Sequence, residues 1–204
     1  MTSPPQARPG SGRAWAAGLA CAGVGLVLRL SHLAALRALP TFDGYIMDEA
    51  YHDTWARAIA SGDWLGTEVF FRAPLYPYFL GAVYAVAGTG GLAPRLIQCL
   101  LGSLSVLLVH RIGLRIGSRG SAAAAALLTA LCGPLIHFDN ELLITVLEGH
   151  LLLAALLLLL KGVQKEAGGA GRARIFLAAG AVLGLAAIAR PNMLAAAPAA
   201  LAAA

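Results

Sequence analysis

Long apolar runs constrain this chain more than any other feature of its sequence. Five runs approach the roughly 20 residues that a helix needs to cross the hydrocarbon core of a bilayer. They cover residues 14–28 (extendable to 39), 92–109, 122–136, 142–160 and 175–189. The chain is 59% hydrophobic and 12% charged, so it has too few polar residues to cover a soluble domain. Because the runs lack the alternation of barrel strands, we predict an all-α, polytopic transmembrane helix bundle.

The amino-terminal region contains a short polar tail and then the first apolar run. Residues 1–12 include three Pro, two Gly and two Ser, which predicts a disordered tail. The first run resembles a signal peptide, but apolar sequence continues well past the small residues around Ala20. We therefore predict an uncleaved first span, with residues 13–204 forming the transmembrane domain.

Basic residues predict which loops face the cytoplasm. Residues 110–120 carry three arginines and no acid, and residues 161–174 carry four basic residues and one acid. Short loops of this kind are typically cytoplasmic. A sixth apolar run, 75–88, has only 14 residues and begins near Pro74 and Pro77, which favours a re-entrant or interfacial segment. The tail 1–12 is then cytoplasmic, and residues 40–91 form one extracytoplasmic loop carrying amphipathic interfacial helices.

An acidic, aromatic stretch in that loop is the first candidate site. Helical spacing from residue 48 to 61 places Tyr51, Trp55 and Ile59 on an apolar face, with Glu49, Asp53 and Arg57 opposite. Asp48 falls on the apolar side, and a carboxylate there needs a partner or a function. The alternative is structural, with Asp48 as an N-cap and Glu49 as a first-turn acid. His52, also on the apolar side, is either a hydrogen-bonding interfacial residue or a ligand for the acceptor or a metal.

A second acidic cluster is predicted to emerge on the same side of the membrane. Asp139 and Glu141 follow the third apolar run, and a helix from residue 140 would align Glu141, Thr145 and Glu148 on one face. An intramembrane glutamate indicates a functional site, and these three acids are candidates for acceptor or metal binding. In the structural alternative, Arg29 or His32 of the first span pairs with Glu148.

Three arginines are predicted at the boundary between external loops and spans: Arg72, Arg95 and Arg190. A guanidinium at headgroup depth can bind a phosphate through two parallel hydrogen bonds. An acid that deprotonates an acceptor, beside cations that hold a phosphate, meets the requirements of transfer from a lipid phosphate. The alternative is that each arginine only anchors its helix at the interface.

The order of these features resembles the GT-C superfamily, specifically the glycosyltransferase 39 group that includes protein O-mannosyltransferases and bacterial aminoarabinose transferases. The matching segments are "DEAYHDTWARAIASGDW", "FRAPLYPYFLGAVYAVAG", "APRLIQCLLGSLSVLLVHRIGLRIGSRGSAAAAALLTALCGPLIHFDNELL" and "GLAAIARPNML". The resemblance implies that Asp48 and Glu49 belong to the catalytic centre, with Asp48 as general base. The stretch "FDNE" also resembles the second acidic loop of oligosaccharyltransferase catalytic subunits, which implies that it helps to bind a divalent metal. Members of this group are much longer, so we expect the chain to be a truncated form.

We therefore predict a glycosyltransferase that moves a sugar from a polyprenyl-phosphate donor to an extracytoplasmic protein, lipid or glycan. Such donors need no nucleotide, and the sequence has no phosphate-binding Gly-rich loop of the P-loop or dinucleotide type. We expect no nucleic-acid partner. The arginine bias and alanine richness suggest a bacterial source, hence a multi-pass protein of the inner membrane. A transporter or flippase subunit and a non-catalytic membrane assembly protein are the alternatives.

Overall fold

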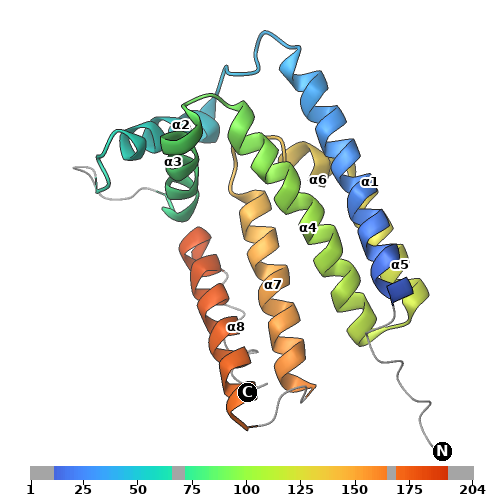
Figure 1. Cartoon of the computed structure of the whole chain (residues 1–204). Coiled ribbons are helices and arrows are strands. Elements are labelled where there is room, and N and C mark those ends of the chain that lie inside the picture. Colours follow the sequence, from blue (N-terminus) through green and yellow to red (C-terminus); the bar gives the residue numbers. More distant parts are fainter. Residues whose placement is uncertain (1–11, 66–71, 165–168, 193–204) are drawn as a thin grey trace, which may run out of the picture.

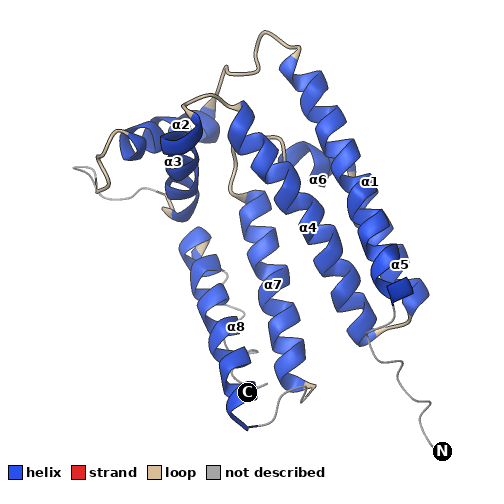
Figure 2. Ribbon diagram, viewed as in Figure 1, coloured by secondary structure: helices blue, strands red, loops and turns tan. Residues whose placement is uncertain are grey.

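The computed structural model describes residues 12–65, 72–164 and 169–192, and these fold into helices without a strand (Figures 1 and 2). The predicted tail 1–12 therefore lies almost entirely outside the described residues. The helices are α1 (Gly12–Arg37), α2 (Met47–Ala60), α3 (Leu75–Ala87), α4 (Leu92–Ile116), α5 (Arg119–Leu131), α6 (Gly133–Phe138), α7 (Thr145–Val163) and α8 (Gly169–Ala189).

Four of the described helices are long and apolar enough to cross a membrane. They are α1 from Trp15, α4, α7 and α8. In Figure 1, α4 lies between α1 and α7, and α8 packs on the far side of α7. The prediction of an all-α bundle with several membrane-spanning helices is confirmed.

The run at 122–136 does not form the single crossing helix that we predicted. It is divided between α5, which has 13 residues, and the short α6. Cys132 is extended between them, with ψ at 103°, and Pro134 lies at the start of α6. Proline cannot donate the backbone hydrogen bond that a continuous helix requires, so the helix ends before it. The chain still returns from the α4–α5 turn to the opposite end of the bundle (Figure 1).

Helices α2 and α3 form a small layer at that opposite end (Figure 1). Their shared core contains Ala56, Tyr76, Leu80, Tyr84 and Leu142. A Cβ added at Gly81 would lie 2.7 Å from Cγ2 of Ile59, so the two helices need glycine there to pack this closely. At 13 residues, α3 is shorter than the crossing helices, and it returns the chain to the end where α4 begins.

The buried face of α2 differs from the predicted one. His52, Asp53, Ala56 and Ile59 are buried. Asp53 was predicted on the solvent side, but Oδ1 accepts a 2.6 Å hydrogen bond from the Tyr84 hydroxyl and Oδ2 accepts a 2.7 Å bond from Arg57. The predicted pairing of Asp53 with Arg57 is confirmed. Two donors compensate the carboxylate for its burial, which explains why this acid lies inside.

Candidate functional site

A cavity of about 290 Å³ lies at the end of the bundle that carries α2 and α3. Four chain segments that are distant in sequence line it: the start of α2, the residues before α3, the entry to α7 and the residues that follow α8. Its polar lining includes Asp48, His52, Arg72, Thr145 and Arg190, and the remaining lining is apolar. The cavity therefore collects a carboxylate, an imidazole and two guanidinium groups.

Asp48 is held at the edge of this cavity by Arg72. The two guanidinium Nη atoms lie 2.7 and 2.9 Å from the two carboxylate oxygens, a bidentate pair. Both side chains are about two-fifths exposed, so the carboxylate remains accessible. The N-cap alternative is wrong, because Ile46 occupies that position and makes no side-chain cap bond. Met47, immediately before Asp48, has a φ of 49°, a strained conformation of the kind found at functional sites.

His52 lies one turn along α2 and is 5% exposed. Its Nδ1 is 3.0 Å from the carbonyl oxygen of Leu142, and its ring packs edge-on against Tyr76 at 5.0 Å between centroids. Burial lowers the pKa of His52 from its ordinary value. The prediction of a hydrogen-bonding residue is confirmed, and the same side chain also lines the cavity.

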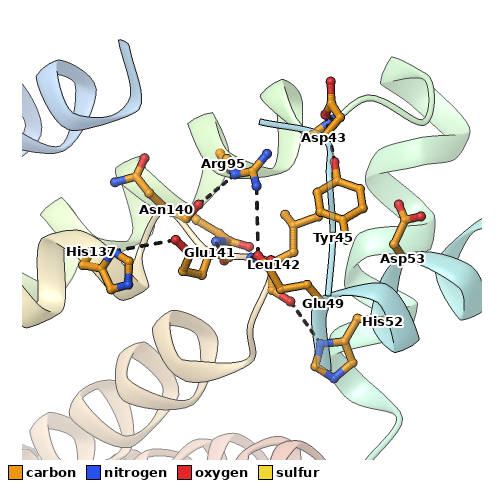
Figure 3. A network of polar contacts seen from close by, with 12 residues as sticks. Asp43, Tyr45, Glu49, His52, Asp53, Arg95, His137, Asn140, Glu141 and Leu142 are labelled. Carbon is orange, nitrogen blue, oxygen red and sulfur yellow. Dashed lines mark hydrogen bonds and ion pairs between the residues drawn. The ribbon is translucent and has the colours of Figure 1, made fainter. Parts of the chain in front are cut away.

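Glu49 points toward the second acidic cluster (Figure 3). Its Oε1 accepts a 2.7 Å hydrogen bond from the backbone N–H of Leu142 and lies 4.0 Å from Nη2 of Arg95. Burial raises the pKa of Glu49; the Leu142 N–H opposes this rise, and the adjacent Glu141 carboxyl adds to it. Glu49 therefore binds α2 to the segment that precedes α7.

Arg95 is buried in the same network rather than in the cavity lining. Its Nε donates a 2.7 Å hydrogen bond to the carbonyl oxygen of Asn140, and its guanidinium lies 4.4 Å from the ring centroid of Phe42. The Tyr45 ring covers it as well, at 5.5 Å. Burial, together with the hydrogen bond to Asp43, raises the pKa of Tyr45 to about 12. Arg95 thus orders the backbone of the second acidic cluster.

Sequence reasoning missed Gln98, a fully buried residue of α4. Its amide nitrogen donates to the carbonyl oxygens of Asp139 and Glu141, at 3.0 and 2.7 Å, while its Oε1 accepts a 2.5 Å bond from the Tyr76 hydroxyl. The signal was present, because a glutamine inside an apolar run needs hydrogen-bond partners. Together with Arg95 and Glu49, Gln98 fixes the segment 139–142 that leads into the cavity wall at residues 143–145.

The second acidic cluster is arranged differently from the prediction. Helix α7 begins at Thr145, so Glu141 lies before the helix and no polar stripe continues from it to Glu148. Oε1 of Glu141 instead lies 3.7 Å from Nδ1 of His137. Asp139 forms a buried 2.6 Å ion pair with Arg29, deep between α1, α4 and α6.

The predicted partners of Glu148 are also wrong. Its carboxylate lies 3.1 Å from Nε of Arg190, a pair that joins α7 to the end of α8. Arg29 forms its ion pair with Asp139 instead. Nε2 of His32 is buried and makes no hydrogen bond with the described residues. Within residues 12–65, 72–164 and 169–192, no three His, Cys, Asp or Glu side chains are arranged to hold a metal ion.

Comparison with known proteins places this architecture in a family. The family model described as dolichyl-phosphate-mannose-protein mannosyltransferase matches residues 72–204, which is more than half of the chain. The match includes Arg72 and Arg190 of the cavity and the segment 139–145, and it begins after α2. Neither the curated proteins nor the solved structures contain a match. The chain therefore belongs to the dolichyl-phosphate-mannose-protein mannosyltransferase family, a family of membrane glycosyltransferases.

Proposed function

We propose that the chain transfers a sugar from a polyprenyl-phosphate donor to a hydroxyl group of an extracytoplasmic acceptor. The observation that carries this proposal is the cavity in which Asp48, Arg72 and Arg190 meet. It combines one accessible carboxylate with two guanidinium groups, the minimal set for deprotonating an acceptor and holding a phosphate. The start of α7 and the end of α8 line the cavity, and both helices are long and apolar enough to cross a membrane, which would let a lipid-linked donor approach from the bilayer.

In the proposed reaction, the acceptor oxygen attacks the anomeric carbon of the sugar. The new carbon–oxygen bond forms as the bond from that carbon to the phosphate oxygen breaks, and the polyprenyl phosphate leaves with the electron pair. Asp48 takes the proton from the acceptor hydroxyl, and Arg72 and Arg190 stabilise the negative charge that develops on the phosphate. Arg72 binds both oxygens of Asp48 before the donor arrives, so the phosphate and the carboxylate compete for it.

Glu49 and Arg95 support this reaction indirectly, by positioning the cavity wall. Both bind the backbone of residues 140–142, which leads directly into the cavity wall at Leu143, Ile144 and Thr145. We therefore assign Glu49 and Arg95 as positioning residues, and keep the phosphate-binding role for Arg72 and Arg190.

The same architecture supports a proposal for the orientation in the membrane. Helices α4 and α5 meet at the end of the bundle opposite α2 and α3 (Figure 1), and the sequence around this turn carries Arg111, Arg115 and Arg119. The positive-inside tendency would place that end in the cytoplasm, with the cavity and the loop 40–91 on the outer side. We propose a bacterial inner membrane with a cytoplasmic amino terminus.

A transfer assay on membranes containing the full chain tests the proposal. Radiolabelled polyprenyl-phosphate mannose, glucose and aminoarabinose would each be supplied, and label would be followed into protein, lipid and glycan fractions. We expect Asp48→Asn to reduce transfer at least about 100-fold, because general-base catalysis typically contributes that much. Asp63→Asn, an exposed acid of the same loop outside the cavity, is the matched control and should retain activity. Wild-type membranes that transfer none of these sugars, or transfer that Asp48→Asn leaves intact, would contradict the assignment.

A further inference from the structure

The hydrogen-bond partner of His52 determines which of its ring nitrogens carries a proton. Nδ1 lies 3.0 Å from the Leu142 carbonyl oxygen, and a carbonyl oxygen only accepts hydrogen bonds. Nδ1 must therefore be the N–H donor. Burial lowers the pKa of this imidazole, which keeps the ring neutral and leaves a lone pair on Nε2.

Nε2 makes no hydrogen bond with the described residues, and His52 lines the cavity beside Asp48. Figure 3 shows the ring with Nδ1 turned toward Leu142 and its other nitrogen turned away from the network. The charged groups that act electrostatically on the ring are the carboxylates of Asp48 and Glu49 and the guanidinium of Arg72. The cavity thus contains a neutral hydrogen-bond acceptor besides its charged groups.

We propose that Nε2 of His52 accepts a hydrogen bond from a hydroxyl group of the molecule bound in this cavity. This inference rests on the proposed function and adds a residue that recognises the sugar or the acceptor. The arginines donate hydrogen bonds and suit the phosphate, whereas a neutral ring nitrogen suits a hydroxyl donor. The hydroxyl belongs either to the sugar of the donor or to the acceptor, and the experiment distinguishes these two sources.

Two substitutions separate the two nitrogens. His52→Asn keeps an N–H near the position of Nδ1, so it preserves the bond to Leu142 and removes the acceptor at Nε2. His52→Gln reaches the Nε2 position with an amide oxygen and loses the bond to Leu142. We expect His52→Asn to fold with wild-type thermal stability but to lower kcat/KM about 3- to 10-fold, the effect of one neutral hydrogen bond, with His52→Gln closer to wild type.

The kinetics also identify the hydroxyl. If it belongs to the acceptor, His52→Asn raises the KM for the acceptor. If it belongs to the sugar, His52→Asn reduces the preference of the binding site for polyprenyl-phosphate mannose over polyprenyl phosphate. A purely structural role for His52 gives the reverse order, with His52→Asn active and His52→Gln impaired, and that result would overturn the inference.

A measurement that needs no activity distinguishes this inference from the proposed function. In the full chain labelled with ¹⁵N-histidine, His52 should show a protonated Nδ1 and an unprotonated Nε2, assigned by the signal missing from His52→Asn. Adding polyprenyl-phosphate mannose or the acceptor should shift the Nε2 signal, while His150, bonded to Ser105 outside the cavity, should not move. A proton on Nε2, or an unchanged Nε2 with both ligands, refutes the inference. The expected shift without any sugar transfer refutes only the proposed function.

Discussion

Gly102 of α4 offers a direct test of the buried ion pair that joins α1 to α6. A Cβ added at this glycine would lie 2.0 Å from Oδ2 of Asp139 and 2.6 Å from Nε of Arg29, the two atoms that form the pair. Real Cβ contacts are never this short, so Gly102→Ala must displace the carboxylate from the guanidinium. Their side chains are 6% and 1% exposed, so water cannot replace the lost contact.

The expected cost follows from two opposing contributions. Separating a buried ion pair costs about 3–5 kcal/mol, whereas alanine in place of a helical glycine recovers about 1 kcal/mol. Gly102→Ala should therefore lower the free energy of unfolding by about 2–4 kcal/mol, measured by denaturant titration of the detergent-purified protein. Gly23→Ala is the matched control, because it lies in α1 and its added Cβ meets no atom within 4 Å.

A double-mutant cycle with Asp139 sharpens this test. Asp139→Ala removes the carboxylate that the new methyl group would displace and also the partner that holds Arg29 in place, so the Arg29 side chain can move aside. Gly102→Ala should therefore cost little further stability in that background. If Gly102→Ala is as harmless as Gly23→Ala in the wild-type background, the carboxylate does not rest against Gly102. The arrangement of α1, α4 and α6 described above would then be wrong.

Three further predictions concern the layer that supports the cavity. Gln98→Leu leaves two backbone carbonyls without their donor and should lower the free energy of unfolding by about 1–3 kcal/mol in the same titration. Gly81→Ala forces α3 away from α2 and should increase amide hydrogen exchange in α2, whereas Gly149→Ala, which has open space, should not. Burial raises the pKa of Glu49 in the folded protein above its ordinary value of 4.5. The protonated side chain therefore stabilises the fold at low pH, and this contribution is lost as the pH rises from 4.5 through the raised pKa. Glu49→Gln cannot titrate, so it should flatten the dependence of the melting temperature on pH over this range.

Hydropathy was sufficient to predict the bundle because each crossing helix must satisfy its backbone within one apolar segment. The runs at 92–109 and 142–160 correspond to α4 and α7, and the run at 75–88 corresponds to α3, which is shorter than the four candidate crossing helices. The division of the run at 122–136 was also readable, since Pro134 lies inside it. Its effect was underestimated because composition alone does not show where a helix ends.

The ion-pair and hydrogen-bond partners of the buried charged residues could not be predicted, because they depend on packing between segments that are distant in sequence. Arg29 pairs with Asp139 across 110 positions, although Glu148 was an equally plausible acid from composition. Asp53 was placed on the wrong face for the same reason, since its second donor, Tyr84, is on another helix 31 residues away. Helical periodicity assigns a residue to a face, but a buried carboxylate is stable only where a donor meets it.

The contacts of segment 139–142 could not be predicted from the sequence, because they are made by its backbone groups, which every residue has. Carbonyl oxygens of Asp139, Asn140, Glu141 and Leu142 face side chains of α2 and α4, and the N–H of Leu142 binds Glu49. The next three residues line the cavity that holds Asp48. The family match begins after α2, so it does not include Asp48, Glu49 or His52. Geometry connects these residues to the matched region. Helix α2 shares one cavity with Arg72 and Arg190, which lie within that region, and it binds the same region through Leu142.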